Sequence, residues 1–214
     1  MLHGKDILVL SPHTDDVELG CGGTLARLAE DNGARLLYLA LSSAEESLGE
    51  GLPRNTLVQE ALLAAASLGI PKSDVCVKSY RVRRFAQFRQ EILEELVRVR
   101  HRFQPGLVLT PSRCDMHQDH RVVTEEALRA FKHTSILGYE LPWNEIDKPF
   151  MPQLYIALSR RHLERKITAL KRYKSQAERP YMDPDFTWGL AKLRGIQSGL
   201  RYAEAFEVMR WVMP

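Results

Sequence analysis

Two short clusters of histidine and aspartate offer the chemistry of a metal site. His13 and Asp16 stand three residues apart in SPHTDD, and His117 and His120 have the same spacing in MHQDH. Imidazole and carboxylate groups are ordinary ligands of zinc and other divalent first-row metals. Two ligands from one cluster and one from the other would leave a fourth position open, as in a catalytic zinc site. Asp15 stands beside a ligand without being needed as one, so it is placed to accept a proton from water.

Each cluster also has a structural interpretation. Asp15 or Asp16 can cap the helix expected to follow, because aspartate is a common N-cap. Asp119 can likewise cap the helix expected through VVTEEALRAFK, with His117 an incidental loop residue. One capped helix does not use two aspartates and a histidine, and the presence of two such clusters favours a joint site.

Apolar runs precede both clusters, and they alternate with helical patterns along the first half of the chain. Continuous apolar runs are typical of strands covered on both faces. The predicted strands are 6–10, 35–42, 75–80 and 106–110. The predicted helices are GTLARLAEDNG, ending at Gly33, RNTLVQEALLAAASLGIP, closed by Gly69 and Pro71, and FAQFRQEILEELVRVRHRFQP, closed by Pro105.

This alternation predicts an α/β fold, a single Rossmann-like domain over residues 1–214 with a mostly parallel sheet flanked by helices. In such sheets ligands bind beyond the carboxyl ends of the strands, near the point where the strand order reverses. Because each cluster follows a predicted strand, we expect the metal site at this edge. The second half is less regular, with strands predicted at 136–141 and 154–159 and helices around 160–177 and 185–197.

Composition limits the partners and the compartment. The net charge is +3, and the 30 basic residues are spread along the chain, which argues against nucleic acid as a partner. Three widely spaced cysteines without a CxxC motif indicate reduced thiols in a cytoplasmic protein. No apolar stretch approaches the ~20 residues needed to cross a bilayer, so no membrane role is expected.

The glycines of GCGGT, residues 20–24, raise the possibility of a dinucleotide site. That fingerprint needs glycine at position 25, where Leu25 stands, and should begin directly after the strand. We instead expect Gly20, Gly22 and Gly23 to bring the backbone close to the metal loop and to start a helix facing the site.

The sequence resembles the LmbE-like, PIG-L-type de-N-acetylases. SPHTDDVELGCGGTLARLAE is similar to their P-H-P-D-D … G-C-G-G-T-L signature, and HQDH with Arg121 to their H-P-D-H-R motif. RNTLVQEALLAAASLGI, KITALKRYKSQ and YAEAF add further similarity, so that the resemblance runs from about residue 5 to 210. Thr14 and Gln118 replace prolines that are usual in the family, at loop positions that contribute no ligand.

The resemblance implies a role for each site residue. His13, Asp16 and His120 would bind one zinc ion, although iron or another divalent metal is compatible with the same ligands. Asp15 would be the general base, and His117 the second catalytic histidine, oriented or tuned by Asp119 and kept cationic by it. The implied reaction is hydrolysis of an N-acetyl group, usually that of an N-acetylglucosamine unit.

The resemblance says less about the substrate. Arg54 stands where the family has a residue near the sugar and would suit hydroxyls or a phosphate, although it can equally pair with a helix carboxylate. A small N-acetylated saccharide is the expected partner, and a homo-oligomer is possible.

Two other functions fit parts of the pattern. A metal phosphoesterase on the same kind of sheet would use similar residues, but it often holds two metals and needs more carboxylate ligands than the clusters supply. A sugar- or nucleotide-binding module without catalysis predicts missing catalytic residues, whereas Asp15 and the three candidate ligands are present.

Overall fold

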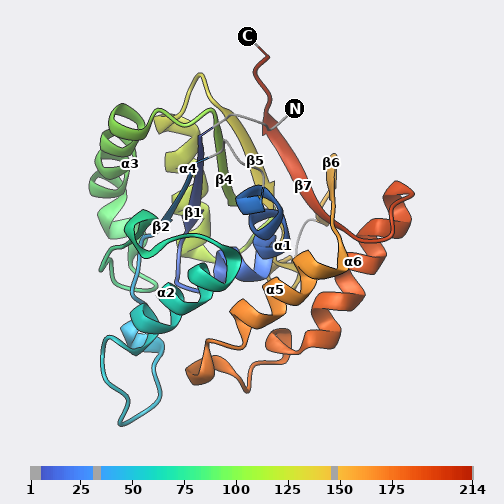
Figure 1. Ribbon diagram of the computed structural model, residues 1–214. Helices are drawn as coiled ribbons and strands as arrows, with labels where there is room; N and C mark the ends of the chain where they lie inside the picture. The colour runs from blue at the N-terminus through green and yellow to red at the C-terminus, as the bar shows by residue number, and fades with distance from the viewer. Residues whose placement is uncertain (1–5, 31–34, 146–148, 214) are drawn as a thin grey trace.

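The computed structural model describes residues 6–30, 35–145 and 149–213, and a mixed β-sheet forms its centre (Figure 1). Within these residues the sheet has the strand order β3-β2-β1-β4-β5-β7-β6. Its strands are β1 (Ile7–Ser11), β2 (Leu36–Ala40), β3 (Val75–Val77), β4 (Leu107–Pro111), β5 (Ser135–Tyr139), β6 (Leu154–Ala157) and β7 (Ala203–Arg210).

The first five strands are parallel, which confirms the predicted α/β architecture. From β1 the chain first adds β2 and β3 on one side and then β4 and β5 on the other, so the strand order reverses between β1 and β4. β7 runs antiparallel to both β5 and β6. The reversal point is where sheets of this class bind ligands.

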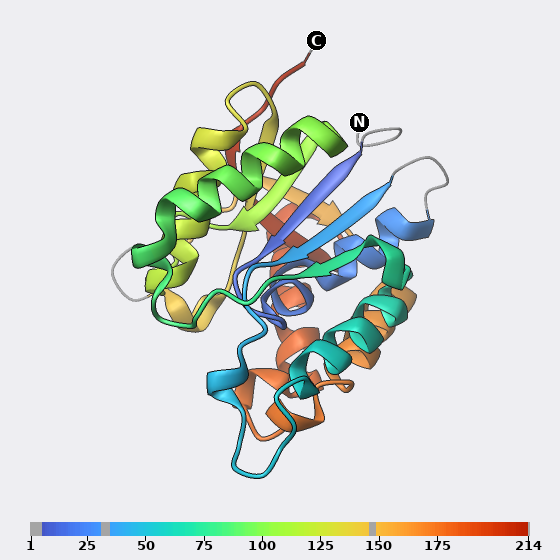
Figure 2. The same ribbon diagram turned by 90° about the vertical axis from the view of Figure 1, so that its left-hand side faces the viewer.

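Helices cover both faces of the sheet, because the side chains of each strand alternate between two cores. Ile7 and Val9 of β1 belong to the core shared with α1, α2 and α5, whereas Leu8 and Leu10 belong to the core shared with α3 and α4. Figure 2 shows the two helical layers on opposite sides of the strands. The helices are α1 (Asp16–Glu30), α2 (Thr56–Leu68), α3 (Arg89–Phe103), α4 (Gln118–Ala130), α5 (Arg160–Leu170) and α6 (Pro184–Ser198).

Several helix ends lie where the sequence predicts them. α2 ends at Gly69, whose φ of 87° is the left-handed conformation that favours glycine. The helix predicted around 160–177 is shorter than expected. α5 stops at Leu170, and short 3₁₀ turns follow it. The predicted stop at Gly33 lies outside the described residues. None of the described helices is long and apolar enough to cross a bilayer.

The start of α1 differs from the prediction. The helix begins at Asp16 and includes the glycines, which therefore lie inside it and are buried. Gly20 packs against Tyr139 of β5, where a Cβ atom would stand 2.2 Å from the Tyr139 Cδ2. The backbone leaves helical geometry at Cys21, with φ −144° and ψ 21°. The glycines thus serve close packing and a break in the helix.

A buried ion pair satisfies the backbone groups that this break leaves without helical partners. Lys166 of α5 donates from Nζ to the carbonyl oxygen of Leu19, at 2.7 Å. Glu204 of β7 accepts from the N–H groups of Gly23, at 3.0 Å, and Thr24, at 2.6 Å. The two side chains also pair with each other at 2.7 Å. Together they cap both halves of α1, and the segments KITALKRYKSQ and YAEAF supply them.

Candidate metal centre

The two histidine–aspartate clusters meet at the reversal point of the sheet. His13 and Asp15 lie in the turn between β1 and α1, and Asp16 is the first residue of α1. His117 is the N-cap of α4, and His120 lies in the first turn of that helix. Because β1 and β4 are neighbours, their following loops bring these side chains to one place.

Three ligand atoms form a nearly equilateral triangle. His13 Nδ1 lies 3.3 Å from Asp16 Oδ2 and 3.3 Å from His120 Nε2, and the last two atoms are 3.2 Å apart. Zinc bound tetrahedrally at about 2.0–2.1 Å separates its ligands by about 3.3–3.4 Å. The triangle therefore has the size of three ligands of one tetrahedral ion, with the fourth corner left for another molecule.

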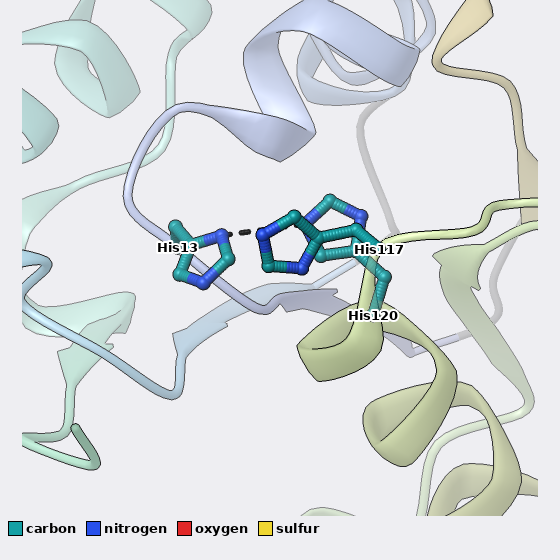
Figure 3. Close-up of side chains that lie close together, drawn as sticks. All are labelled: His13, His117 and His120. Carbon is teal, nitrogen blue, oxygen red and sulfur yellow. Dashed lines mark hydrogen bonds between the residues drawn. The ribbon is translucent and has the colours of Figure 1, made fainter. Parts of the chain in front are cut away.

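His117 is the third histidine at this place. Nitrogen atoms of His13, His117 and His120 lie within 4.8 Å of one another, so the three rings can hold a metal ion. In Figure 3 the rings of His13 and His120 face each other, and His117 lies behind His120. The set with Asp16 in place of His117 is the compact triangle described above, with its three ligand atoms 3.2–3.3 Å apart.

Asp119 supports His13. Its Oδ2 lies 3.0 Å from His13 Nε2 and accepts from the N–H of Arg83 at 2.5 Å, while Oδ1 accepts from the N–H of Phe85 at 3.3 Å. A carboxylate on the far nitrogen fixes the ring of a metal-ligating histidine. The carboxylate of Asp119 thus has another partner than the predicted one: it contacts His13, and the backbone N–H of Asp119 contacts the His117 ring. The charge of Asp119 raises the pKa of His117, but burial and the other histidines outweigh it, so Asp119 does not keep that ring cationic.

Asp115 supports His120 in the same way. It is not among the predicted site residues. Its Oδ2 lies 2.7 Å from His120 Nδ1 and accepts from Asn144 Nδ2 at 3.2 Å. Its other oxygen accepts from the N–H of His117 at 2.8 Å. The residue is buried. Its position five residues before a predicted ligand was the one signal in the sequence.

His117 is neutral in this setting. Burial, followed by the charges of His120 and His13, lowers its pKa to about 4. Its Nδ1 accepts a hydrogen bond from the backbone N–H of Asp119 at 3.2 Å. A neutral ring with Nδ1 as acceptor carries its proton on Nε2, so His117 is a hydrogen-bond donor at that atom.

Asp15 and Asp16 have opposite electrostatic surroundings. Burial, reinforced by the charge of Asp16, raises the pKa of Asp15 to about 6. Burial also acts on Asp16, but the charges and hydrogen bonds of His120 and His13 hold its pKa well below the usual range. Asp16 is therefore a permanent anion, while Asp15 can exchange a proton near neutral pH.

A cavity of about 270 Å³ opens onto these side chains. Its lining includes Asp15, His117 and His120 on one side and Trp143, Gln176, Arg179 and Tyr181 among the remaining residues. Arg54 does not line it. That arginine is exposed and lies in a separate hollow with Glu45, Glu46 and Arg81.

The sequence matches the family of GlcNAc-PI de-N-acetylases (PIG-L) over residues 8–131, which is more than half of the chain and contains both clusters. This chain belongs to the PIG-L family. An Escherichia coli relative described as the uncharacterized deacetylase YaiS is 30% identical over 176 residues, covering 80% of this chain and 91% of that protein. A diacetylchitobiose deacetylase of Thermococcus kodakarensis is 27% identical over 233 residues, covering 94% of this chain and 81% of that protein.

Structural similarity extends to a PIG-L-like fold with another activity. GalB of Pseudomonas putida, a 4-carboxy-2-hydroxymuconate hydratase, matches with a TM-score of 0.79 and 20% identity, covering 98% of each chain. At this identity the likeness shows the fold alone. The fold therefore accommodates more than one reaction, and the reaction has to be argued from the site.

Proposed function

We propose that this PIG-L family protein is a zinc-dependent hydrolase that removes the acetyl group from an N-acetylglucosamine-type sugar. The triangle of His13, Asp16 and His120 carries the proposal, because its dimensions suit one tetrahedral ion with an open corner. The two deacetylase relatives support the choice of bond. Iron accepts the same ligands, so metal identity is part of the test.

The donor set fits a hydrolytic metal site in its charge as well as its size. Two imidazoles and one carboxylate would hold the ion, and Asp119 and Asp115 contact the far nitrogens of the two rings and fix their orientation. When bound, a divalent ion of this kind polarises a carbonyl oxygen and makes water more acidic.

Asp15 is the general base in this proposal. It lines the cavity, and in the described part of the chain no side chain donates a hydrogen bond to its carboxylate. A pKa of about 6 lets it accept a proton from the attacking water near neutral pH. Asp16 cannot do this, because both histidines hold it as an anion.

His117 stabilises the charge that develops on the acetamide oxygen. As water adds to the carbonyl carbon, the Nε2–H of the neutral ring donates a hydrogen bond to that oxygen. A neutral imidazole can perform this task because it does not have to give up its proton. When the C–N bond breaks, the protonated Asp15 returns its proton to the departing amine, so acetate and a free amino sugar leave.

The alternative functions predict different products or metal contents. A phosphoesterase with two metals would need a second group of ligands, and the described residues offer one histidine group for a metal, at this site. A binding module without catalysis, or a hydratase, would release no acetate from an N-acetylated sugar.

The test combines acetate release with metal analysis. Purified protein is incubated with N-acetylglucosamine, its glycosides and diacetylchitobiose, with and without a chelator, and acetate is measured enzymatically. We expect acetate with at least one sugar, one metal ion per chain and loss of activity after chelation. Two ions per chain, or no acetate from any sugar by the metal-loaded protein, would contradict the proposal.

A further inference from the structure

The cavity has a second wall that the proposed chemistry does not use. Asp15 and the histidines form the wall at the carboxyl ends of β1 and β4. Facing the same space are Trp143, from the 3₁₀ turn after β5, and Arg179 and Tyr181, from the segment between α5 and α6. In the proposed reaction, this wall is available to the part of the substrate beyond the acetamide.

Arg179 is the one lysine or arginine among the described residues that line the cavity. Its guanidinium donates one hydrogen bond, from Nη1 to the Tyr181 hydroxyl at 2.5 Å, and has no carboxylate partner in the described chain. A guanidinium has five N–H donors, so most of them remain for a ligand. Many other arginines of this protein, such as Arg194 and Arg89, pair with glutamates.

The position of Arg179 is fixed by aromatic side chains. Its guanidinium carbon lies 5.9 Å from the centroid of the Tyr181 ring. Tyr181 stacks on Trp143, with ring centroids 4.3 Å apart and an interplanar angle of 14°. The stack on Trp143 holds the Tyr181 ring, and the Tyr181 hydroxyl in turn holds the guanidinium at the cavity, which lowers the entropic cost of binding a ligand.

Asp15 and Asp16 line the same cavity, and in the described chain neither forms an ion pair with Arg179. A guanidinium at a cavity without a carboxylate partner is available to bind an anionic group of a ligand.

We propose that Arg179, held by Tyr181 and Trp143, binds an anionic group on the substrate, so that the preferred N-acetylated sugar carries a phosphate or carboxylate outside its acetamide. This inference rests on the proposed deacetylase function and narrows its substrate class. The aromatic pair would cover the apolar C–H surface of the sugar ring while the guanidinium contacts the anion.

The test uses substrates that differ only in charge. The values of kcat/KM are measured by acetate release for N-acetylglucosamine 1-phosphate, the carboxymethyl glycoside and the neutral methyl glycoside. The variants are Arg179→Gln, Arg179→Lys and, as a matched control, Arg172→Gln, an exposed arginine of the same segment that does not line the cavity. Binding of glucosamine 1-phosphate and methyl glucosaminide, the corresponding products, is measured by calorimetry as a second readout.

We expect the wild-type protein to prefer one of the anionic substrates, and the comparison of phosphate with carboxylate identifies the group. Arg179→Gln should lower the anionic-to-neutral ratio of kcat/KM about 10- to 100-fold. Arg179→Lys should restore part of it, because lysine keeps the charge without the planar fork. Arg172→Gln should leave the ratio at the wild-type value.

Two failures can be told apart. Equal kcat/KM for charged and neutral sugars, with a ratio unchanged in Arg179→Gln, would overturn the anion site and leave the deacetylase function standing. Absence of acetate from every sugar would overturn the deacetylase function. In that case the calorimetry decides the anion site. Tighter binding of glucosamine 1-phosphate than of methyl glucosaminide, lost in Arg179→Gln, would still support it. Equal binding of the two sugars would overturn the anion site as well.

Discussion

Asp15 and Asp16 are neighbours in the chain, but their carboxyl groups perform different tasks because their surroundings differ. Asp16 accepts hydrogen bonds or ion pairs from the backbone and ring of His13 and from the ring of His120. Asp15 faces the cavity, no side chain of the described residues donates a hydrogen bond to it, and burial raises its pKa to about 6. In the proposed reaction, two residues of the same type therefore serve as a metal ligand and as a base.

Replacing each aspartate by asparagine separates these tasks. Asp15→Asn should keep the metal content and lower kcat about 10²- to 10⁴-fold, because the amide cannot accept the proton. Asp16→Asn should lose the metal itself. Elemental mass spectrometry measures the metal content of each variant, and acetate release measures kcat. An Asp15→Asn protein with near-normal kcat would show that the base is another group.

Asp115 acts through His120. Its hydrogen bond to Nδ1 directs the Nε2 lone pair toward the other ligands, so Asp115→Asn should weaken metal binding about 10- to 100-fold. Competition with a chromophoric chelator measures this affinity. Asp185→Asn, at an exposed aspartate in the first turn of α6, is the control and should change nothing. An unchanged metal affinity in Asp115→Asn would show that Asp115 does not support metal binding through His120.

The types and spacing of the site residues were predictable from sequence, whereas some of their partners were not. His13, Asp16 and His120 are recognisable because ligand chemistry restricts the residue types. The partners of Asp119 and Asp115 depend on how two loops cross in space, and spacing along the chain carries no such information. Hence the contact between the Asp119 carboxylate and His13 was not predicted, and neither was the role of Asp115.

At the scale of elements, the break in α1 accounts for one wrong prediction and is linked to one strand that was not predicted. The glycines suggested a helix start, but they lie in a helix interior, where Gly20 packs against β5 and Gly23 against Glu204 of β7. β7 was not predicted as a strand, because its inward-facing positions include Glu204, which disrupts the apolar alternation. The same glutamate is needed to cap the second half of α1. The need for a buried glutamate to cap α1 therefore explains why β7 does not show the apolar alternation of a strand.

The ion pair at this break should be essential to stability. Lys166→Met leaves Glu204 buried without its partner and the Leu19 carbonyl without its donor, which should cost about 3–5 kcal/mol of unfolding free energy. Urea denaturation measures the loss. Lys171→Met, at an exposed lysine directly after α5, is the matched control and should stay within about 0.5 kcal/mol.

Replacing both partners should not restore stability here. In many proteins an apolar pair substitutes well for a buried ion pair. In this protein Glu204 also accepts from the N–H groups of Gly23 and Thr24, so Lys166→Met with Glu204→Met leaves both donors unsatisfied. Each should cost about 1–3 kcal/mol. A double variant as stable as the wild type would show that the pair does not cap α1.

At the scale of the whole molecule, the candidate metal centre lies where the two halves of the sheet meet. His13 and Asp16 follow β1, His120 lies on the helix after β4, and the strand order reverses between these strands. An ion held by all three side chains would therefore cross-link loops that are about a hundred residues apart in sequence. The parallel sheet was predictable because its strands are continuous apolar runs. Because loops meet where the strand order reverses, the loops after β1 and β4 could then be expected to form one site.

Metal removal should consequently lower the thermal stability of the entire chain. A ligand at 100 times its Kd stabilises the folded state by about 2.7 kcal/mol, which corresponds to roughly 5–10 °C in Tm for a chain of this size. Thermal unfolding with and without chelator measures the shift, and adding zinc back should restore it. Asp16→Asn is the control, because a protein without the carboxylate ligand should show the same Tm under both conditions. If the Asp16→Asn protein gains as much Tm from zinc as the wild type, the ion binds without Asp16, and the three histidines alone would be the better assignment of the site.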